Sequence, residues 1–195
     1  MTDISDRVKI EEIELLSDNH YTLNNVRFGW RRDDGTWQQT AREVYDCGDG
    51  CTILLFNRPQ RTVILTRQFR MPAFQQGYRD LLIETAAGLL DNADPATRIV
   101  SEAEEETGFT PRNLRKIGEC YMAPGAVQQK IHLFIGEYDP ADRGGKGGGL
   151  ADEGEDIEVL ELAFDEAVAM MQDGRICDAK TIILLQYAQL HIFPK

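Results

Sequence analysis

A single well-marked helix set among strand-like segments is the feature that most constrains how this chain can fold. Asp94-Pro95 predicts where the helix begins, because Asp accepts hydrogen bonds from a first turn and Pro suits the first helical position. Gly108 predicts its end, since glycine readily adopts the left-handed conformation that closes a helix. Runs rich in β-branched and aromatic residues predict strands at 21–31, 36–44, 52–56, 62–69, 81–85, 114–121, 131–138 and 156–162.

Two further helices are predicted at 164–172 and 179–192. The order of strands, helix, strands and helices indicates an α/β fold of the α+β type. Asp33-Asp34-Gly35 predicts a hairpin turn within the first strands, which are typical of a small antiparallel sheet of their own. We therefore expect two domains, an N-terminal antiparallel sheet at 1–46 and a larger domain at 47–195.

The balance of charge narrows the classes of partner. The chain carries 33 acidic and 21 basic residues, which gives a formal net charge of −12. This excess argues against nucleic acid or an anionic membrane as a partner, because both attract positive surfaces. The N-terminus lacks a basic segment followed by an apolar run, and no apolar stretch approaches the ~20 residues of a membrane span. A cytoplasmic protein is expected. Most of the excess charge falls at 102–106 and 152–161.

The helix end at 101–108 concentrates acidic side chains where each opposes the helix dipole by roughly 0.3–1 kcal/mol. Glu102, Glu105 and Glu106 fall at i, i+3 and i+4, so their carboxylates share one helix face. A bound cation would relieve the repulsion, and ligands that offer only oxygen favour Mg²⁺, Mn²⁺ or Ca²⁺ over zinc. A solvated acidic face and a purely structural cation site are the alternative interpretations.

The segment 88–109 resembles the Nudix box, a motif that joins a glycine to a helix with an acidic end. The box positions are filled by Gly88, Asp94 and Ser101-Glu102-Ala103-Glu104-Glu105-Glu106-Thr107-Gly108-Phe109. Asp94 replaces the usual Glu, Ser101 replaces the usual Arg, and the spacing from Gly88 to Glu102 is one residue shorter than usual. In the family that arginine helps to orient the metal-binding glutamates, and Arg98, one turn earlier, is a candidate for the same role.

Other stretches resemble the nucleotide-sugar branch of the Nudix hydrolases: 42–46, 67–70, 83–92, 121–125 and 152–159. The shortened box and the segments 89–92, 158–162 and 178–181 are most similar to members that act on GDP-mannose. The resemblance implies a Nudix α/β/α sandwich with a mixed sheet. It also implies a homodimer in which the N-terminal sheets are exchanged between subunits.

The same resemblance implies the metal site and the catalytic base. Glu102 and Glu106, with Glu105 close behind and the backbone carbonyl of Ala87, are expected to bind Mg²⁺, with Mn²⁺ as an alternative. The base is expected on a mobile loop before a late strand. Glu153 is the first choice and Glu155 the second, and Glu105 is a further catalytic candidate.

Phosphate groups need positively charged partners, and arginine can offer two parallel hydrogen bonds. Arg42, Arg67 and Arg70 lie at predicted strand ends and are candidates for substrate binding, with Tyr45 as an aromatic contact for the nucleobase. The glycine-rich segment 143–149 lacks the spacing of a phosphate-binding loop. Its glycines predict a flexible tether, and those at the start of the acidic loop suit a lid.

The expected function is Mg²⁺-dependent hydrolysis of the pyrophosphate bond of a nucleoside diphosphate sugar. GDP-mannose, giving GMP and mannose 1-phosphate, is the preferred substrate, and ADP-ribose is the alternative within the same class. The alternative from another class is a catalytically silent Nudix module that binds a nucleotide.

Overall fold

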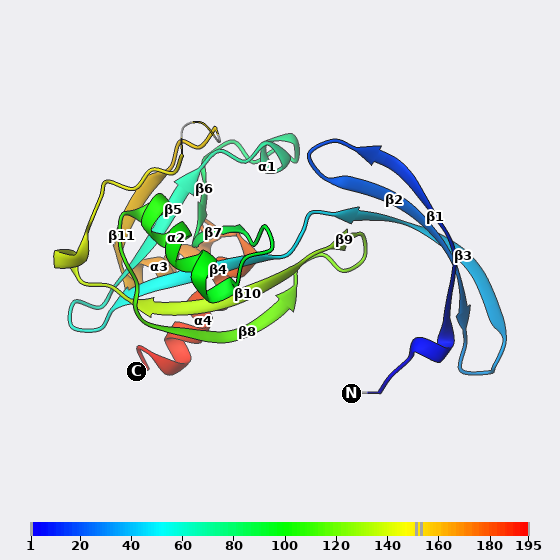
Figure 1. Cartoon of the computed structure of the whole chain (residues 1–195). Coiled ribbons are helices and arrows are strands. Elements are labelled where there is room, and N and C mark those ends of the chain that lie inside the picture. The colour runs from blue at the N-terminus through cyan, green and yellow to red at the C-terminus, as the bar shows by residue number, and fades with distance from the viewer. Residues whose placement is uncertain (1, 151, 153, 195) are drawn as a thin grey trace. The chain divides into compact units, whose positions relative to one another are not determined.

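The computed structural model describes residues 2–150, 152 and 154–194. It divides into two compact units, and each unit joins two separate stretches of the chain. The first contains residues up to 49 together with 121–130, and the second contains residues 50–120 together with those from 131 onward. In Figure 1 most of the first unit is blue, and the second runs mainly from cyan to red.

The first unit is a four-stranded sheet in the order β1-β2-β3-β9. Its strands are β1 (Val8–Asp18), β2 (Thr22–Arg31), β3 (Trp37–Asp46) and β9 (Val127–Gln128), and the short 3-10 helix η1 (Ser5–Arg7) precedes them. β1, β2 and β3 pair antiparallel, and β9 joins β3 in parallel. The strands predicted at 21–31 and 36–44 are confirmed, whereas β1 and β9 are additional.

Two β-bulges explain why the sequence pattern does not reveal β1. Its apolar residues Ile10, Ile13 and Leu15 do not follow the two-residue period of a strand. In the sheet, however, Glu11 and Leu16 fall at register shifts and have no opposing residue. Each bulge takes up one extra residue, and the one at Glu11 brings Ile10 into phase with Ile13 and Leu15, so the three apolar residues oppose alternate positions of β2 and share one face. Their partners are Phe28, Val26 and Asn24.

The second unit is built on a seven-stranded mixed sheet. Its main path runs β11-β5-β4-β10-β8, while β6 and β7 pair with β5 and β4. The strands are β4 (Gly50–Asn57), β5 (Thr62–Gln68), β6 (Leu82–Glu84), β7 (Ala86–Leu89), β8 (Arg112–Tyr121), β10 (Lys130–Glu137) and β11 (Glu158–Ala163). β4 pairs with β10 in parallel, and β5 pairs antiparallel with β4 and β11. The predicted mixed sheet is confirmed.

Helices cover both faces of this sheet, which gives the α/β/α sandwich that the resemblance implies. Every residue of β4 is buried, as in a strand with both faces covered. Ile53 packs in a cluster with Ile99 and Ala103 of one helix, whereas Phe56 points the other way and packs edge-on against Phe193. The helices are α1 (Met71–Gln75), α2 (Pro95–Thr107), α3 (Phe164–Asp173) and α4 (Ala179–His191), with a 3-10 turn η2 (Pro140–Asp142). Figure 1 shows α2 in front of the sheet and α3 and α4 behind it.

α2 begins and ends where the sequence predicts. The Asp94 side chain accepts hydrogen bonds from Ala96 N and Thr97 N, and Pro95 occupies the first turn. Gly108 closes the helix in the left-handed conformation at φ 79°, and its N–H donates to the carbonyl of Glu104. Because both ends are fixed by local bonds, the face of the helix on which each glutamate lies is fixed as well.

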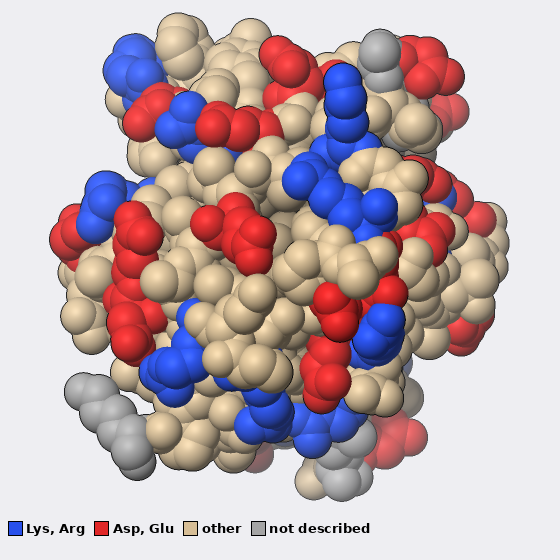
Figure 2. Space-filling model, turned by 90° about the vertical axis from the view of Figure 1, so that its left-hand side faces the viewer, with Lys and Arg blue, Asp and Glu red and all other residues tan. Residues whose placement is uncertain are grey.

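The surface shows no dominant field of one sign on the face drawn in Figure 2, where acidic and basic side chains lie interspersed. The formal charge of −12 is therefore not spread as a uniform acidic coat over that face. Within the described part of the chain, no helix is long and apolar enough to cross a membrane. The four cysteines are free thiols.

Candidate active site

The acidic end of α2 divides into a buried half and a more exposed half. Glu102 and Glu106 lie one turn apart on a buried face of the helix, with exposed fractions of 5% and 1%. Glu105 is half-buried. Glu104 is exposed and accepts a hydrogen bond from Thr110 Oγ1 at 2.6 Å. Burial of two carboxylates in one place is costly unless their surroundings compensate the charge.

Glu102 is held on two sides. Arg98 Nη2 lies 2.5 Å from Glu102 Oε1, and Arg98 Nε donates to the carbonyl of Leu89 at 3.1 Å. On the other side the carboxylate lies against the backbone of Gly88, where a Cβ atom would overlap it. Arg98 thus places a positive charge beside Glu102, whereas position 101, where the motif usually has an arginine, holds the uncharged Ser101.

Glu106 is less well compensated. Its Oε2 atom is buried and has no hydrogen-bond partner within the described residues. Burial, and then the charges of Glu102 and Glu155, raise the pKa of Glu106 to about 9, while Arg70 acts to lower it. A carboxyl group in such surroundings either keeps its proton or binds a cation.

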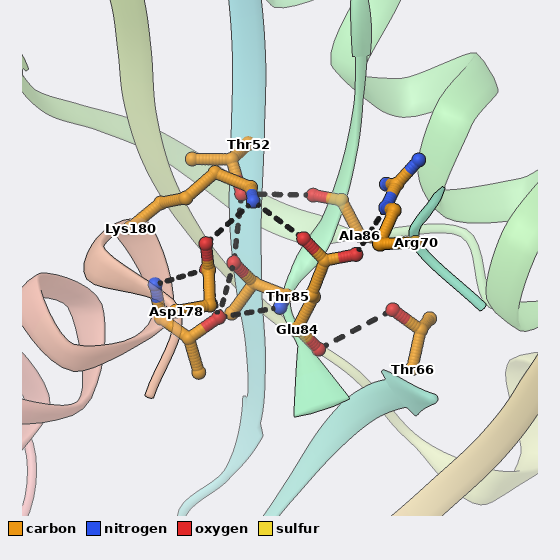
Figure 3. A network of polar contacts seen from close by, with 9 residues as sticks. Thr52, Thr66, Arg70, Glu84, Thr85, Ala86, Asp178 and Lys180 are labelled. Atoms are coloured by element: carbon orange, nitrogen blue, oxygen red, sulfur yellow. Dashed lines mark hydrogen bonds and ion pairs between the residues drawn. The ribbon is translucent and has the colours of Figure 1, made fainter. Parts of the chain in front are cut away.

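A third buried carboxylate, that of Glu84 at the end of β6, lies in the same electrostatic neighbourhood. Its exposed fraction is 3%. Glu84 Oε2 accepts from Arg70 Nε at 2.8 Å, and Glu84 Oε1 accepts from Lys180 Nζ at 2.8 Å. Lys180 Nζ also donates to Asp178 Oδ1 at 2.9 Å. Figure 3 shows the Glu84 carboxylate between the two cations, which reach it from opposite sides.

Both cations stay charged in this network. Burial acts to lower the pKa of Lys180, but the carboxylates of Glu84 and Asp178 outweigh that effect and the pKa is raised. Burial acts in the same way on Arg70, and Glu84, followed by Glu106 and Glu155, raises its pKa. Arg70 therefore lies within the electrostatic field of three carboxylates, those of Glu84, Glu106 and Glu155.

The glycine-rich segment 143–149 packs against the C-terminal end of α2. Gly148 N and Gly149 N donate to the last carbonyls of the helix at 2.9 and 3.1 Å. Gly147 has φ 68°, and a Cβ atom there would lie 2.5 Å from the carbonyl oxygen of Glu106. These glycines permit a close backbone approach that satisfies the end of a helix. The segment is thus a cap on α2, and the predicted tether is corrected.

This loop also brings one of the two predicted bases to the site. Glu155 Oε2 accepts from Leu150 N at 3.0 Å. The charge of Glu155 helps to raise the pKa of both Glu106 and Arg70, so its carboxylate lies within electrostatic range of them. The other predicted base, Glu153, lies outside the described residues.

Arg67, predicted to bind substrate, is paired within the sheet. Arg67 Nη2 lies 2.8 Å from Glu158 Oε2, and these two residues oppose each other across β5 and β11. Its Nε atom is buried and has no hydrogen-bond partner within the described residues. Arg67 therefore uses Nη2 in a contact within the protein, while its Nε forms no hydrogen bond to the described residues.

Arg42 and Tyr45 belong to the first unit. Arg42 Nη1 donates to the carbonyl of Ala41 at 2.7 Å, and the Arg42 side chain lines a cavity of about 420 Å³ together with Phe28. The ring of Tyr45 packs edge-on against that of Tyr21, with centroids 5.6 Å apart. These two residues form part of the surface of the N-terminal sheet.

Two observations fit a divalent cation between the buried glutamates. Glu106 Oε2 is a buried acceptor without a partner among the described residues, and the Glu102 carboxylate lies against Gly88, which adjoins Ala87. Across the described residues, no group of three or more His, Cys, Asp and Glu side chains is arranged to hold a metal ion. The fit therefore rests on the carboxylates of Glu102 and Glu106 alone.

Glu84 and Lys180 are absent from the predicted site residues. The signal for Glu84 is a single acidic residue within the apolar run Leu81–Ala87, because a carboxylate is seldom buried in a strand without a partner. Lys180 offers a weaker signal, since a lysine in the first turn of a helix is usually exposed. Only the fold shows that these two residues meet.

The N-terminal sheet matches a known family model. That model, described as the GDP-mannose pyrophosphatase NudK N-terminal domain, matches residues 7–45. These residues include β1 to β3 almost completely.

Curated proteins are similar over nearly the whole chain. The GDP-mannose pyrophosphatase of Pectobacterium atrosepticum is 50% identical over 186 residues, which is 95% of each chain. That of Yersinia enterocolitica is 52% identical over 187 residues, which is 94% of this chain and 97% of its own. A solved structure described as an ADP compounds hydrolase superposes with a TM-score of 0.73 at 16% identity, covering 96% of this chain and 95% of that one. At that identity the structural likeness concerns the fold.

Proposed function

This chain belongs to the GDP-mannose pyrophosphatases, a branch of the Nudix hydrolases, and from that premise we propose that it hydrolyses GDP-mannose to GMP and mannose 1-phosphate. The observation that carries the proposal is the buried pair Glu102 and Glu106 with Arg70 beside it. An acidic pocket next to a cation suits a pyrophosphate that is bound partly through a divalent ion and partly through an arginine.

We assign Mg²⁺, with Mn²⁺ as an alternative, to Glu102, Glu106 and the carbonyl of Ala87, with Glu105 as a further ligand. The unpartnered Glu106 Oε2 supports this assignment. When bound, such an ion neutralises charge on the pyrophosphate and makes a nearby water more acidic.

The side chains of the chain itself supply orientation and proton transfer. Arg70 donates from Nε to Glu84, and we assign its two terminal nitrogens to phosphate oxygens of the substrate. Glu155 has Oε2 on Leu150 N, and its Oε1 is the atom that we assign to accept the proton of the attacking water. Glu153 is the alternative base, and Arg67 a second phosphate contact. The oxygen of that water bonds to phosphorus as the bridging P–O bond breaks.

We also propose that the enzyme is a cytoplasmic homodimer whose N-terminal sheets are exchanged between subunits. On β1, Ile10, Ile13 and Leu15 are exposed by 62%, 60% and 57% on one face of the sheet. Contiguous exposed apolar side chains of this kind are typical of surfaces that another protein covers. In such a dimer, Arg42 and Tyr45 serve the substrate from this sheet.

The test is a product assay with a panel of nucleoside diphosphate sugars, with and without Mg²⁺. GDP-mannose is expected to give GMP and mannose 1-phosphate only with the metal, and Glu106→Gln is expected to lose this activity. Glu104→Gln is the matched control, because Glu104 lies two residues away but is exposed and bonded to Thr110. Full activity of Glu106→Gln would contradict the proposal.

The same assay separates the two alternatives. A higher kcat/KM for ADP-ribose than for GDP-mannose would reassign the substrate, because discrimination between substrates is expressed in that ratio. Binding of a nucleotide without Mg²⁺-dependent turnover of any sugar would indicate a silent binding module.

A further inference from the structure

We propose that Glu84 is a positioning residue of this site, whose single buried carboxylate, itself held by Lys180, sets the direction in which Arg70 meets the phosphate groups of the substrate. This inference rests on the proposed function, because it concerns how the same site holds a nucleoside diphosphate sugar. It assigns no contact between Glu84 and the substrate.

The two oxygens of Glu84 are divided between two cations. Oε2 binds Arg70 Nε and Oε1 binds Lys180 Nζ, each at 2.8 Å. Both oxygens of the carboxylate are therefore engaged within the protein. Since the two cations come from segments that are far apart in the chain, one after β5 and one on α4, a single group fixes their separation. Figure 3 shows this arrangement from close by.

Arg70 is bonded in a way that leaves its far end available. Its contact with Glu84 is made through Nε, and its terminal nitrogens make no hydrogen bond to the described residues. The Arg70 side chain is 42% exposed, while that of Glu84 is 4% exposed. Because a guanidinium is a rigid plane, an anchor at Nε sets the direction of the two terminal nitrogens. The guanidinium of Arg70 lies in the electrostatic field of Glu106 and Glu155, where the phosphates are proposed to bind.

Lys180 is held more tightly. Its side chain is 15% exposed and its ammonium group bonds to both Glu84 and Asp178. Asp178 is itself fixed, because its Oδ2 caps α4 by accepting from Thr181 N at 3.0 Å. An ammonium group has three donors, so one remains for a further acceptor.

A purely structural ion-pair network is the competing explanation. Buried networks of this kind are weak evidence for stability, since loss of hydration offsets much of the attraction between the charges. The backbone at Glu84 also has anchors that do not involve the carboxylate: Thr66 Oγ1 donates to the carbonyl of Glu84 at 3.3 Å, and Thr85 N donates to Thr181 Oγ1 at 2.8 Å. β6 is therefore held in place by bonds that do not involve the Glu84 carboxylate. The main effect of that carboxylate is then to orient the half-exposed Arg70.

The decisive experiment is a double-mutant cycle in kcat/KM for GDP-mannose, using Glu84→Gln, Arg70→Ala and the double variant. If Glu84 acts through Arg70, Glu84→Gln lowers kcat/KM by about tenfold or more, and Arg70→Ala costs clearly less in the Gln background than in the wild type. Effects that multiply independently, or a Glu84→Gln enzyme within about twofold of wild type, would overturn the proposal.

Glu84→Gln leaves Lys180 with one carboxylate fewer in a buried place, so this variant can fail to fold. Glu84→Asp keeps the charge but shortens the reach by one methylene, and it is expected to fold while kcat/KM falls by about tenfold. Thr66→Val is the matched control, since it removes the bond to the Glu84 carbonyl and leaves the carboxylate in place. It is expected to lower the melting temperature but not kcat/KM. Wild-type kcat/KM in folded Glu84→Asp would refute the positioning role.

Calorimetric binding of inorganic pyrophosphate with Mg²⁺ separates this inference from the proposed function. Weaker binding of pyrophosphate by Glu84→Asp, with coupling to Arg70→Ala, supports the positioning role. It does so even if no sugar nucleotide is hydrolysed, because a lack of hydrolysis counts against the proposed function alone. Equal binding by Glu84→Asp and wild type, in an enzyme that does hydrolyse GDP-mannose, rejects the positioning role and leaves the function intact.

Discussion

Gly88 lies so close to the Glu102 carboxylate that a Cβ atom on Gly88 would overlap it. The φ angle of Gly88 is outside the left-handed region, so the glycine is needed for space and not for backbone conformation. The residue that opens the acidic motif in the sequence is thus a packing partner of its first buried glutamate. Glu102 is confined between this backbone and Arg98.

Gly88→Ala is therefore expected to displace Glu102. The added methyl group forces a shift in a packed region, at a cost of about 1–3 kcal/mol in stability. We expect a lower melting temperature and a large loss of activity. Gly118→Ala is the control, because Gly118 lies in β8 with no atom within 4 Å of its ideal Cβ position. If Gly88→Ala and Gly118→Ala have the same melting temperature and activity, the packing of Gly88 against Glu102 does not matter for function.

Removal of Arg98 tests the other side of Glu102. Arg98→Ala is expected to leave the fold intact but to raise the Mg²⁺ concentration for half-maximal activity by about 10–100-fold, the usual effect of losing a group that orients a metal ligand. It should also reduce the gain in melting temperature on addition of Mg²⁺. Arg112→Ala, which removes an exposed arginine paired with Asp142 and Asp139, serves as the control. An unchanged Mg²⁺ requirement would show that Arg98 does not take over the role of the arginine that Ser101 replaces.

The parts of this site that depend on neighbours in sequence could be predicted, and those that depend on distant partners could not. Asp94 and Gly108 fix α2 through bonds within the helix, so their residue types alone locate its ends. Glu84 and Lys180 are 96 positions apart, and nothing in either local pattern indicates that they meet. The apolar face of β1 could not be predicted for the same reason. The position of each bulge, and so of each extra residue, depends on how β1 pairs with β2.

The stability of the metal-free protein is expected to depend on pH through Glu106. Its pKa is raised from the ordinary 4.5 to about 9 in the folded state. The folded state therefore keeps a proton that the unfolded state loses above its own pKa. Stability from this group is greatest below about pH 4.5 and falls as the pH rises towards about 9, by up to roughly 1.4 kcal/mol per unit.

Denaturant titrations of wild type and Glu106→Gln, with divalent ions removed, measure this contribution. The Gln side chain does not titrate, so the variant should lose less stability than wild type between about pH 5 and about pH 8. The difference between the two proteins is the relevant quantity, because the other carboxylates titrate in both. Parallel curves would mean that Glu106 is ionised without a metal.

The cap on α2 provides a further prediction. Gly147→Ala introduces a Cβ atom against the carbonyl of Glu106 at a residue with positive φ, so the loop is expected to leave the helix end. Because this loop also carries Glu155, we expect kcat to fall more than KM changes. Gly144→Ala is the control within the same segment, since it has open space at its ideal Cβ position. Equal kcat values for Gly147→Ala and Gly144→Ala would show that the cap on α2 does not contribute to catalysis.

The apolar face of β1 gives the last prediction, which concerns assembly. Ile13 and Glu14 are neighbours on β1 whose side chains point to opposite faces, so Ile13→Lys and Glu14→Lys place the same side chain on each face. If the face with Ile10, Ile13 and Leu15 is covered in a dimer, Ile13→Lys buries an unpaired charge and weakens association by about tenfold or more. Sedimentation equilibrium of the two variants and the wild type measures this. A monomeric wild type would exclude the dimer, and equal weakening by both variants would place the interface elsewhere.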